Sequence, residues 1–229
     1  MAEKTSRVGL AGKRLFDILV AGVGLCLLAP VLLLLAALVA VGSGFPVFYR
    51  EYRVGRYNRP FPLYKFRTLR AGSGTRRSIA PEDDPRIVGA GLWLRRWRLD
   101  ELPQLYSVLC GDMSLVGPRP MPPSHAASLP AWQRERILSV RPGVTDPAAL
   151  YFLGEDAVLS GRDNQEALYL QYLLPAKAAM QIDSLREWSF PEDMRVLLRT
   201  LALLWSPGER KRSAAAMRQL LPDADGHGS

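Results

Sequence analysis

Residues 18–41 contain no charged side chain, and no other feature of this 229-residue chain constrains its fold as strongly. A straight helix over these residues would be about 36 Å long, which is enough to cross the hydrocarbon core of a bilayer. A cleaved signal peptide fits poorly, because the apolar stretch is too long and no small-residue cleavage site stands out after it. The sequence therefore predicts that the N-terminal part of the chain is embedded in a membrane.

A proline interrupts this apolar stretch near its middle, at Ala29-Pro30. Proline removes a backbone donor and clashes with the preceding turn, so it breaks or kinks a helix. Basic residues flank both ends, with Lys13 and Arg14 before the stretch and four arginines after it (Arg50, Arg53, Arg56 and Arg59). Since positive residues favour the cytoplasmic side, these flanks predict a re-entrant segment that enters one leaflet, turns at Pro30 and returns. A kinked transmembrane helix is the alternative, because such helices tolerate proline.

The charge distribution points to an anionic surface as a partner. The net charge is +8, and residues 50–77 alone hold nine basic residues and one acidic residue. A basic strip beside an apolar run fits anionic lipid headgroups, and no recognisable nucleic-acid-binding motif is present. Two cysteines without metal-ligand spacing and two isolated histidines argue against a disulfide framework or a histidine-based metal site.

The remaining pattern predicts a fold of the α+β class, mostly helical, with a small hairpin. Strands are expected over 47–49 and 61–68, and helices over 91–98, 102–109, 132–138, 164–188 and 191–205. Trp93 and Trp97 share one face of an arginine-rich helix, which favours an amphipathic helix at the membrane interface over one packed in a soluble core. The predicted organisation is a flexible N-terminus (1–12), a re-entrant membrane segment (13–45), a cytoplasmic domain with interfacial helices (46–206) and a disordered tail (207–229).

The candidate site lies around an adjacent carboxylate pair, Asp100 and Glu101. Taken alone, the pair is more typical of a helix start, with Asp100 as the cap and Glu101 in the first turn. Its surroundings favour chemistry, because three arginines precede it (Arg95, Arg96 and Arg98). Lys65 and Arg67 are expected on one face of a strand, and Arg119 lies between two prolines.

This combination of charges suits a diphosphate. Carboxylates can coordinate Mg²⁺ between phosphate oxygens, which predicts Asp100 and Glu101 as metal ligands. A carboxylate can also attack phosphorus and form an acyl phosphate. Arginines and the metal would neutralise the charge on the transferring group.

Several sequence blocks resemble one known family, the bacterial sugar transferases, which are monotopic phosphoglycosyl transferases acting on polyprenyl phosphate. The blocks are Lys13-Arg14-Leu15-Phe16-Asp17, Ala29-Pro30, Tyr64-Lys65-Phe66-Arg67-Thr68, Leu99-Asp100-Glu101-Leu102-Pro103-Gln104-Leu105, Gly111-Asp112-Met113-Ser114-Leu115-Val116-Gly117-Pro118-Arg119-Pro120 and Val140-Arg141-Pro142-Gly143-Val144-Thr145. Together they cover most of residues 13–205. The chain resembles the small form of the family, without an additional membrane bundle.

The resemblance implies a reaction and roles for individual residues. Asp100 would be the nucleophile toward a UDP-sugar, and UMP would leave. Polyprenyl (undecaprenyl) phosphate would then accept the sugar phosphate. This transfer would be the first membrane step of polysaccharide or glycoconjugate assembly. Glu101 would assist with metal or proton handling. Phosphate or nucleotide contacts are implied for a basic set consisting of Lys65, Arg67, Arg95, Arg119 and Arg141. The implied location is the cytoplasmic face of a bacterial inner membrane.

Some alternatives and departures stay open at this stage. An inverting glycosyltransferase would release UDP instead of UMP, and a non-catalytic scaffold would only bind lipid. Ala29 stands where the family often has serine, and Asp146-Pro147 stands where many members have Gly-Trp, which leaves the sugar specificity undetermined. The C-terminal helices are expected to pack on the membrane face or on a second copy in a homodimer.

Overall fold

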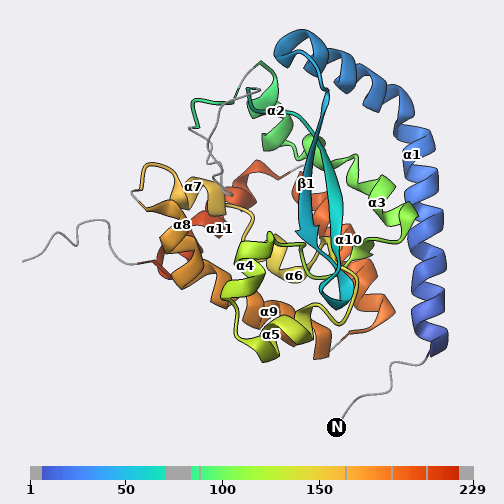
Figure 1. Ribbon diagram of the computed structural model, residues 1–229, viewed down its shortest axis with the longest axis vertical. Coiled ribbons are helices and arrows are strands. Elements are labelled where there is room, and N and C mark those ends of the chain that lie inside the picture. The colour runs from blue at the N-terminus through green and yellow to red at the C-terminus, as the bar shows by residue number, and fades with distance from the viewer. Residues whose placement is uncertain are drawn as a thin grey trace, which may run out of the picture.

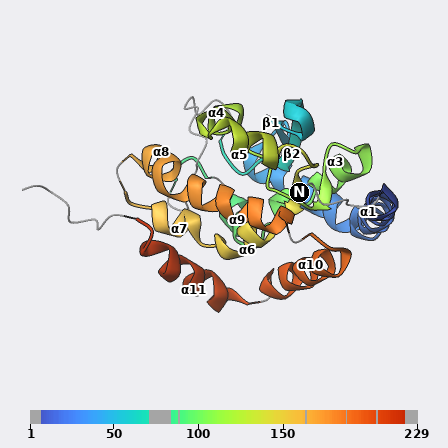
Figure 2. The same cartoon turned by 90° about the horizontal axis from the view of Figure 1, so that it is seen from below.

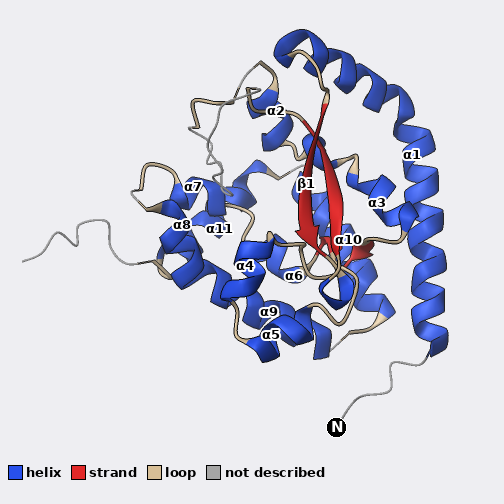
Figure 3. Ribbon diagram, in the orientation of Figure 1, coloured by secondary structure: helices blue, strands red, loops and turns tan. Residues whose placement is uncertain are grey.

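The computed structural model describes residues 7–70, 84–87, 89–162, 164–186, 188–204 and 206–221. The described chain is mostly helical, with a long helix α1 along one side and a strand hairpin beside it (Figures 1 and 3). This confirms the predicted mixture of many helices and a small sheet.

The long apolar helix α1 spans Arg7–Ser43 and stays helical through Pro30. Its axis bends partway along, so that its last turns lean over the top of the molecule in Figure 1. The apolar part, Leu10–Ser43, contains an 18-residue stretch with a mean hydropathy of 2.8, of which only 11% is buried, and this suits contact with lipid. The prediction of a flexible segment over 1–12 is wrong for residues 7–12, which are helical, and residues 1–6 lie outside the described part.

Polar contacts anchor the start of α1 to the rest of the chain. Asp17 is 2% exposed and accepts hydrogen bonds from the Ser114 hydroxyl at 2.8 Å and the Leu115 amide at 3.0 Å. The Arg14 guanidinium donates to the Val108 carbonyl at 2.7 Å, at the end of α3. The basic residues before the apolar stretch therefore bind other parts of the protein, in addition to any contact with lipid headgroups.

Polar contacts anchor the end of α1 as well. The Arg67 guanidinium donates to the carbonyls of Ser43 and Gly44, which a helix terminus leaves without partners. At the opposite end, Lys13 pairs with Asp193 at 2.5 Å, so both ends are attached to the same folded unit.

A two-stranded antiparallel hairpin follows α1. Strands β1 (Phe48–Val54) and β2 (Pro60–Phe66) pair from Phe48 opposite Phe66 to Val54 opposite Pro60. The turn between the two strands contains a short 3-10 helix, Arg56–Asn58. Phe61, Leu63 and Phe66 are buried, and this burial fixes β2 next to the segment that carries the carboxylate pair.

A second, parallel pair brings two loops into contact. Strand β3 (Ser114–Val116) pairs with β4 (Gly143–Thr145). A Cβ on Gly143 would lie 2.1 Å from the amide nitrogen of Gly117, which no side chain can accommodate. Glycine at these positions therefore lets the loop that carries Arg119 lie directly on the next one.

Short helices complete the domain around these strands. Their bounds are α2 Gly91–Arg96, α3 Gln104–Cys110, α4 Pro123–Ser128, α5 Ala131–Ile137, α6 Pro147–Tyr151, α7 Glu155–Leu159, α8 Gln165–Leu168, α9 Leu174–Arg186, α10 Phe190–Leu204 and α11 Pro207–Arg218. Figure 2 shows α9 between two layers, with α4, α5 and the hairpin on one side and α10 and α11 on the other.

The prediction of a disordered tail over 207–229 is wrong for its first part. Residues Pro207–Arg218 form α11, and Ala214, Met217 and Leu221 are buried with residues of α6 and α7. These three positions follow helical spacing, which the polar composition of the segment conceals. Residues 222–229 lie outside the described part, and α11 packs on its own chain.

Candidate active site

The carboxylate pair lies on a sharp connection between α2 and α3. Arg98 adopts the left-handed conformation (φ 53°, ψ 22°), and a 3-10 turn, Leu99–Glu101, follows it. A residue other than glycine rarely adopts this conformation, and such strain is frequent at functional sites. The N-cap position of α3 belongs to Pro103, and no side chain caps that helix, so Asp100 does not act as its cap.

Glu101 is held by three cations from three different segments. Its carboxylate accepts from Lys65 Nζ of β2 at 3.0 Å and from the Arg119 guanidinium, and it lies 3.8 Å from Arg98 Nη1. Burial alone would raise the pKa of Glu101, but Arg119, Lys65 and Arg98 hold this pKa well below its usual range. Glu101 is therefore ionised at neutral pH and fixes the positions of the cations around it.

Asp100 has the opposite environment. It is 9% exposed, and within the described part of the chain no group donates a hydrogen bond to its carboxylate. Burial and the neighbouring Glu101 raise its pKa to about 6, while Lys65, Arg95 and Arg98 act in the opposite direction. A buried carboxylate without a hydrogen-bond donor is poorly solvated. This makes it a stronger nucleophile toward a phosphorus atom.

Arg119 is positioned through its backbone. Its amide donates to Asp146 at 3.1 Å, and the same carboxylate accepts from the Gln181 side chain at 2.8 Å and from the Ala149 amide at 2.5 Å as the cap of α6. Asp146 is 1% exposed. The residue that departs from the family pattern therefore has a clear structural role here, because it joins the Arg119 loop to α6 and α9.

The predicted basic residues do not all meet at the carboxylates. Lys65, Arg95 and Arg119 act on the pair, through contact or through charge. The prediction that Arg67 shares the face of Lys65 is wrong, because β2 ends at Phe66 and Arg67 turns to the end of α1.

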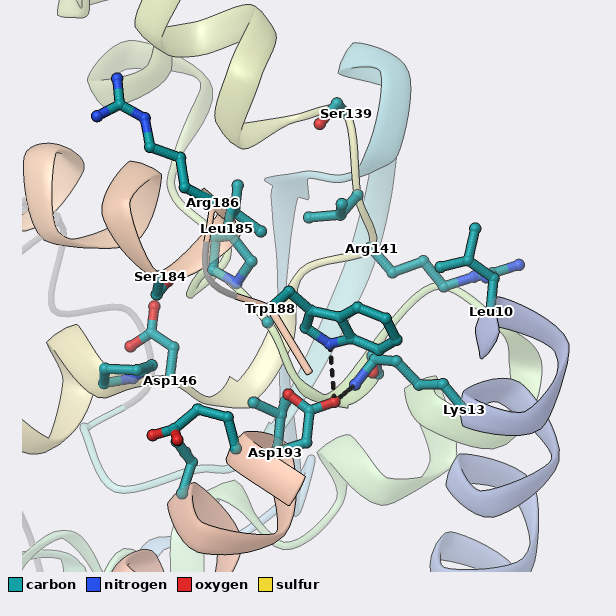
Figure 4. Close-up of a pocket in the computed structure, with 18 of the residues that line it drawn as sticks. Leu10, Lys13, Ser139, Arg141, Asp146, Ser184, Leu185, Arg186, Trp188 and Asp193 are labelled. Atoms are coloured by element: carbon teal, nitrogen blue, oxygen red, sulfur yellow. Dashed lines mark hydrogen bonds and ion pairs between the residues drawn. The ribbon is translucent and has the colours of Figure 1, made fainter. Parts of the chain in front are cut away.

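Arg141 also lies elsewhere than predicted. Its Nε donates to the Gly111 carbonyl at 2.8 Å, and its side chain lines a separate groove of about 1080 Å³ between the start of α1, α5, α9 and α10. Neither Asp100 nor Glu101 lines this groove. Figure 4 shows Arg141 extending toward Leu10, while Lys13 and Trp188 converge on Asp193.

Two residues of the site have roles that the sequence does not reveal. Arg98 is recognisable in the sequence only as a neighbouring charge, because nothing marks an arginine that will adopt the left-handed conformation. Asp146 precedes Pro147, and an acidic residue before a proline at a helix start is a recognisable cap signal. Its contact with Arg119 depends on tertiary structure.

The residues present can accommodate a divalent cation only together with a ligand. Among the described residues, no group of three or more potential metal-binding side chains gathers in one place. Glu101 is engaged by Lys65 and Arg119, so Asp100 offers the available carboxylate oxygens. Mg²⁺ commonly binds through one or two carboxylates plus phosphates and water, so this arrangement is compatible with it.

Taken together, an exposed apolar helix docked on a domain with a buried carboxylate and a cluster of cations is the combination expected of a membrane-associated enzyme that acts on phosphorylated substrates. Comparison with known proteins identifies the family within this class. The family model described as bacterial sugar transferase matches residues 8–206, and the chain belongs to this family.

Curated relatives agree with this assignment. The chain is 34% identical over 197 residues to the UDP-glucose:undecaprenyl-phosphate glucose-1-phosphate transferase of Caulobacter vibrioides, across 84% of this chain and 69% of that protein. It is 34% identical over 191 residues to the uncharacterized sugar transferase EpsL of Bacillus subtilis, across 82% and 85%. A protein of Escherichia coli K12 with the same name as the Caulobacter enzyme is 34% identical over 197 residues, across 82% of this chain and 39% of its own length.

Proposed function

We propose that this protein transfers a sugar 1-phosphate from a UDP-sugar to polyprenyl phosphate of the undecaprenyl type and releases UMP. One observation carries the proposal: a buried carboxylate without a hydrogen-bond donor lies beside a second carboxylate that gathers three cations. The names of the relatives support the substrate classes. Such a step would begin the assembly of a polysaccharide, an O-antigen or another glycoconjugate on the lipid carrier.

The proposed chemistry has two displacements at one phosphorus atom. The ionised Asp100 carboxylate attacks the β-phosphorus of the donor, the bond to the bridging oxygen breaks, and UMP leaves with that oxygen and its electron pair. The sugar phosphate stays on Asp100 as an acyl phosphate. A phosphate oxygen of the acceptor then attacks the same phosphorus, and the Asp100 carboxylate is released unchanged.

The cations around Glu101 would stabilise both displacements. Lys65, Arg98 and Arg119 gather at Glu101, next to Asp100, where they would offset the negative charge that spreads over the phosphoryl oxygens. Glu101 keeps these three long side chains in place before substrate binds, and this preorganisation lowers the barrier. Its proposed role is therefore to position the cations.

Mg²⁺ fits this scheme as a ligand of the donor diphosphate, with Asp100 as its carboxylate ligand and Glu101 beside it. When bound, it would neutralise the developing charge on the leaving UMP. Turnover is expected to require a divalent cation, and removal of the cation by a chelator should stop it reversibly.

We propose further that α1 is re-entrant and that the folded domain lies on the cytoplasmic face of the inner membrane. Two anchors support this topology, since the start of α1 docks through Asp17 and its end through Arg67, both to the same domain. One domain cannot lie on both sides of a bilayer. Pro30 lies inside the helix, and the part of α1 around it is proposed to lie deepest in the leaflet.

The alternatives are less well supported. A lipid-binding scaffold needs no buried carboxylate with a raised pKa. An inverting glycosyltransferase would need a base next to an acceptor hydroxyl and would release UDP.

Product identity tests the proposal. The full chain in membranes is incubated with polyprenyl phosphate, Mg²⁺ and each of a panel of UDP-sugars, and the nucleotide released is measured. UMP is expected with at least one donor, and Asp100→Asn should lower its release by at least about 1000-fold. Asp112→Asn, an exposed aspartate in a neighbouring motif, is the matched control and should stay active. Release of UDP, or strong activity in Asp100→Asn, would reject the covalent scheme.

A further inference from the structure

Two arginines meet at the C-terminal end of α3, at the edge of the groove shown in Figure 4. Arg14 donates to the Val108 carbonyl at 2.7 Å and to the Leu109 carbonyl at 3.0 Å. Arg141 donates to the Gly111 carbonyl, and Arg14 Nη2 lies 3.3 Å from the position that a Cβ on Gly111 would take. The two guanidinium groups are therefore close neighbours.

Two more arginines line the same groove. Arg56 donates through Nε to the Ser139 carbonyl at 3.0 Å, and Arg136 extends from α5. Within the described residues, no carboxylate forms an ion pair with Arg14, Arg56, Arg136 or Arg141. Four positive charges thus share one cavity without direct compensation.

The acidic residues of the groove are engaged elsewhere. Asp17 binds β3, Asp146 caps α6, Glu192 pairs with Arg195, and Asp193 pairs with Lys13 and accepts from Trp188. None of them forms an ion pair with the four arginines, although the charge of Asp17 acts on Arg141, and six basic residues against four acidic ones leave a net positive surface inside a concave site. Such a site attracts anions.

Capping of α3 accounts for only part of this cluster. Carbonyls at a helix end attract arginine side chains, and Arg14 has that role. Arg56 and Arg141, however, bind their carbonyls through Nε alone, and a guanidinium has five N–H groups in a planar fork. Their outer amino groups have no protein acceptor in the described structure. Burial, together with the charges of Arg14 and Arg56, lowers the pKa of Arg141, while the charge of Asp17 acts in the opposite direction.

The rest of the groove is apolar and continues onto the membrane helix. Leu10, Trp132, Leu185 and Trp188 line it, and Leu10 and Trp132 are exposed. Leu15 extends this exposed apolar surface along α1. Tryptophan beside arginine at the start of a lipid-facing helix is typical of the headgroup region of a bilayer. The ligand is thus expected to combine an anionic head with apolar chains.

We propose that this groove binds the phosphodiester headgroup of an anionic phospholipid, with its acyl chains along the first turns of α1. The proposal does not depend on the proposed function. Asp100, Glu101, Lys65 and Arg119 do not line the groove, so a phosphate held there is not the phosphate that reacts. The bound lipid would anchor the domain at the membrane surface through Arg56, Arg136 and Arg141.

Lipid binding to the purified full chain tests this site. Native mass spectrometry in detergent would measure adducts with phosphatidylglycerol, phosphatidylcholine and polyprenyl phosphate at equal concentrations. Phosphatidylglycerol should bind better than phosphatidylcholine, and the double variant Arg56→Gln, Arg136→Gln should lose affinity for phosphatidylglycerol by about 30-fold, because one arginine near a lipid phosphate contributes about 1 kcal/mol. The single variant Arg136→Gln should lose about fivefold. Arg136 is exposed and has no partner in the described structure, so its replacement leaves the fold intact.

The matched control is the double variant Arg59→Gln, Arg134→Gln. It removes the same charge from neighbouring positions that do not line the groove, and it should bind phosphatidylglycerol like the unmodified chain.

An equal loss of affinity in the control would overturn the site in favour of diffuse electrostatic attraction. Loss of polyprenyl phosphate adducts in place of phosphatidylglycerol adducts in the Arg56→Gln, Arg136→Gln variant would overturn the assignment to phospholipid. Displacement of phosphatidylglycerol by an equal concentration of inorganic phosphate would show a site for soluble anions and would also overturn it. Asp100→Asn should leave the adducts unchanged, which separates this proposal from the catalytic one.

Discussion

At the scale of single residues, Asp100 and Glu101 are adjacent in the chain and have opposite electrostatic environments. Cations lower the pKa of Glu101, whereas burial raises the pKa of Asp100 to about 6. Two carboxylates whose pKa values are separated in this way can divide two tasks between them. Here the permanently ionised residue organises the cations, and the poorly solvated one is available to react.

This difference predicts a pH dependence. The ionised form of Asp100 is the proposed nucleophile, so kcat/KM should decline about tenfold for each pH unit below about 6. UMP release across pH 5–8 measures this decline. A rate that stays constant down to pH 5 would contradict a nucleophile with a raised pKa.

The same raised pKa predicts a gain in stability for Asp100→Asn. The folded state binds a proton more tightly than the unfolded chain, so the stabilisation linked to protonation is present below pH 4 and is lost as the pH rises through about 6. At pH 8 the ionised group costs about 3 kcal/mol, and its removal should raise Tm by roughly 6–12 °C. At pH 4 the two proteins should melt alike. A lower Tm for the variant at pH 8 would show that Asp100 is a structural residue.

The sequence was sufficient to predict Lys65 and Arg119 beside the pair, because charge density and family motifs both pointed to them. It was insufficient for Arg67 and Arg141. Strand alternation places Arg67 with Lys65 only if β2 continues, and β2 ends at Phe66. The position of Arg141 depends on how its loop meets Gly111, a contact between distant parts of the chain.

At the scale of elements, two helical segments of this protein continue through a proline without ending. α1 bends and continues through Pro30, and the turn before Pro175 widens into a π-helix over Tyr169–Leu173. A widened turn accommodates the missing donor and the bulk of the ring. Proline disturbs a helix at its own position, but whether the helix bends or breaks depends on what packs against it.

The contact between β3 and β4 should control the Arg119 loop. Gly143→Ala would place a Cβ 2.1 Å from the Gly117 amide nitrogen, which forces the two loops apart. Overpacking of this kind costs about 2 kcal/mol. We expect a lower Tm and a loss of turnover of at least about tenfold, since a displaced Arg119 no longer meets Glu101.

Gly208→Ala is the matched control for this variant, because a Cβ there meets nothing within 4 Å. It should retain both turnover and Tm. Unchanged turnover in Gly143→Ala would show that the loops tolerate separation and that Arg119 is not positioned by this contact.

At the scale of the whole molecule, α1 is part of the domain and not a separate tether. Its start and its end are both bonded to the domain, and its middle carries an exposed apolar surface. The sequence suggested a membrane segment with basic flanks on both sides. The docking of those flanks could not be predicted, because Arg14 and Asp17 find their partners some ninety residues further along the chain.

Cysteine labelling of intact bacterial cells tests the resulting topology. Lys4→Cys and Arg59→Cys are introduced separately after Cys26 and Cys110, both exposed, have been replaced. Neither position should react with an impermeant maleimide until the inner membrane is opened. Labelling of position 4 in intact cells would mean that α1 crosses the bilayer.

The covalent intermediate on Asp100 is the central claim, and peptide mapping after rapid quenching tests it most directly. The full chain is mixed with a UDP-sugar it accepts, without polyprenyl phosphate, quenched in acid, digested and analysed by mass spectrometry. We predict a burst of UMP equal to the amount of enzyme and a sugar phosphate on the peptide that contains Asp100, lost when polyprenyl phosphate is added before the quench. UMP that appears only with the acceptor present, without an adduct on Asp100, would contradict the account.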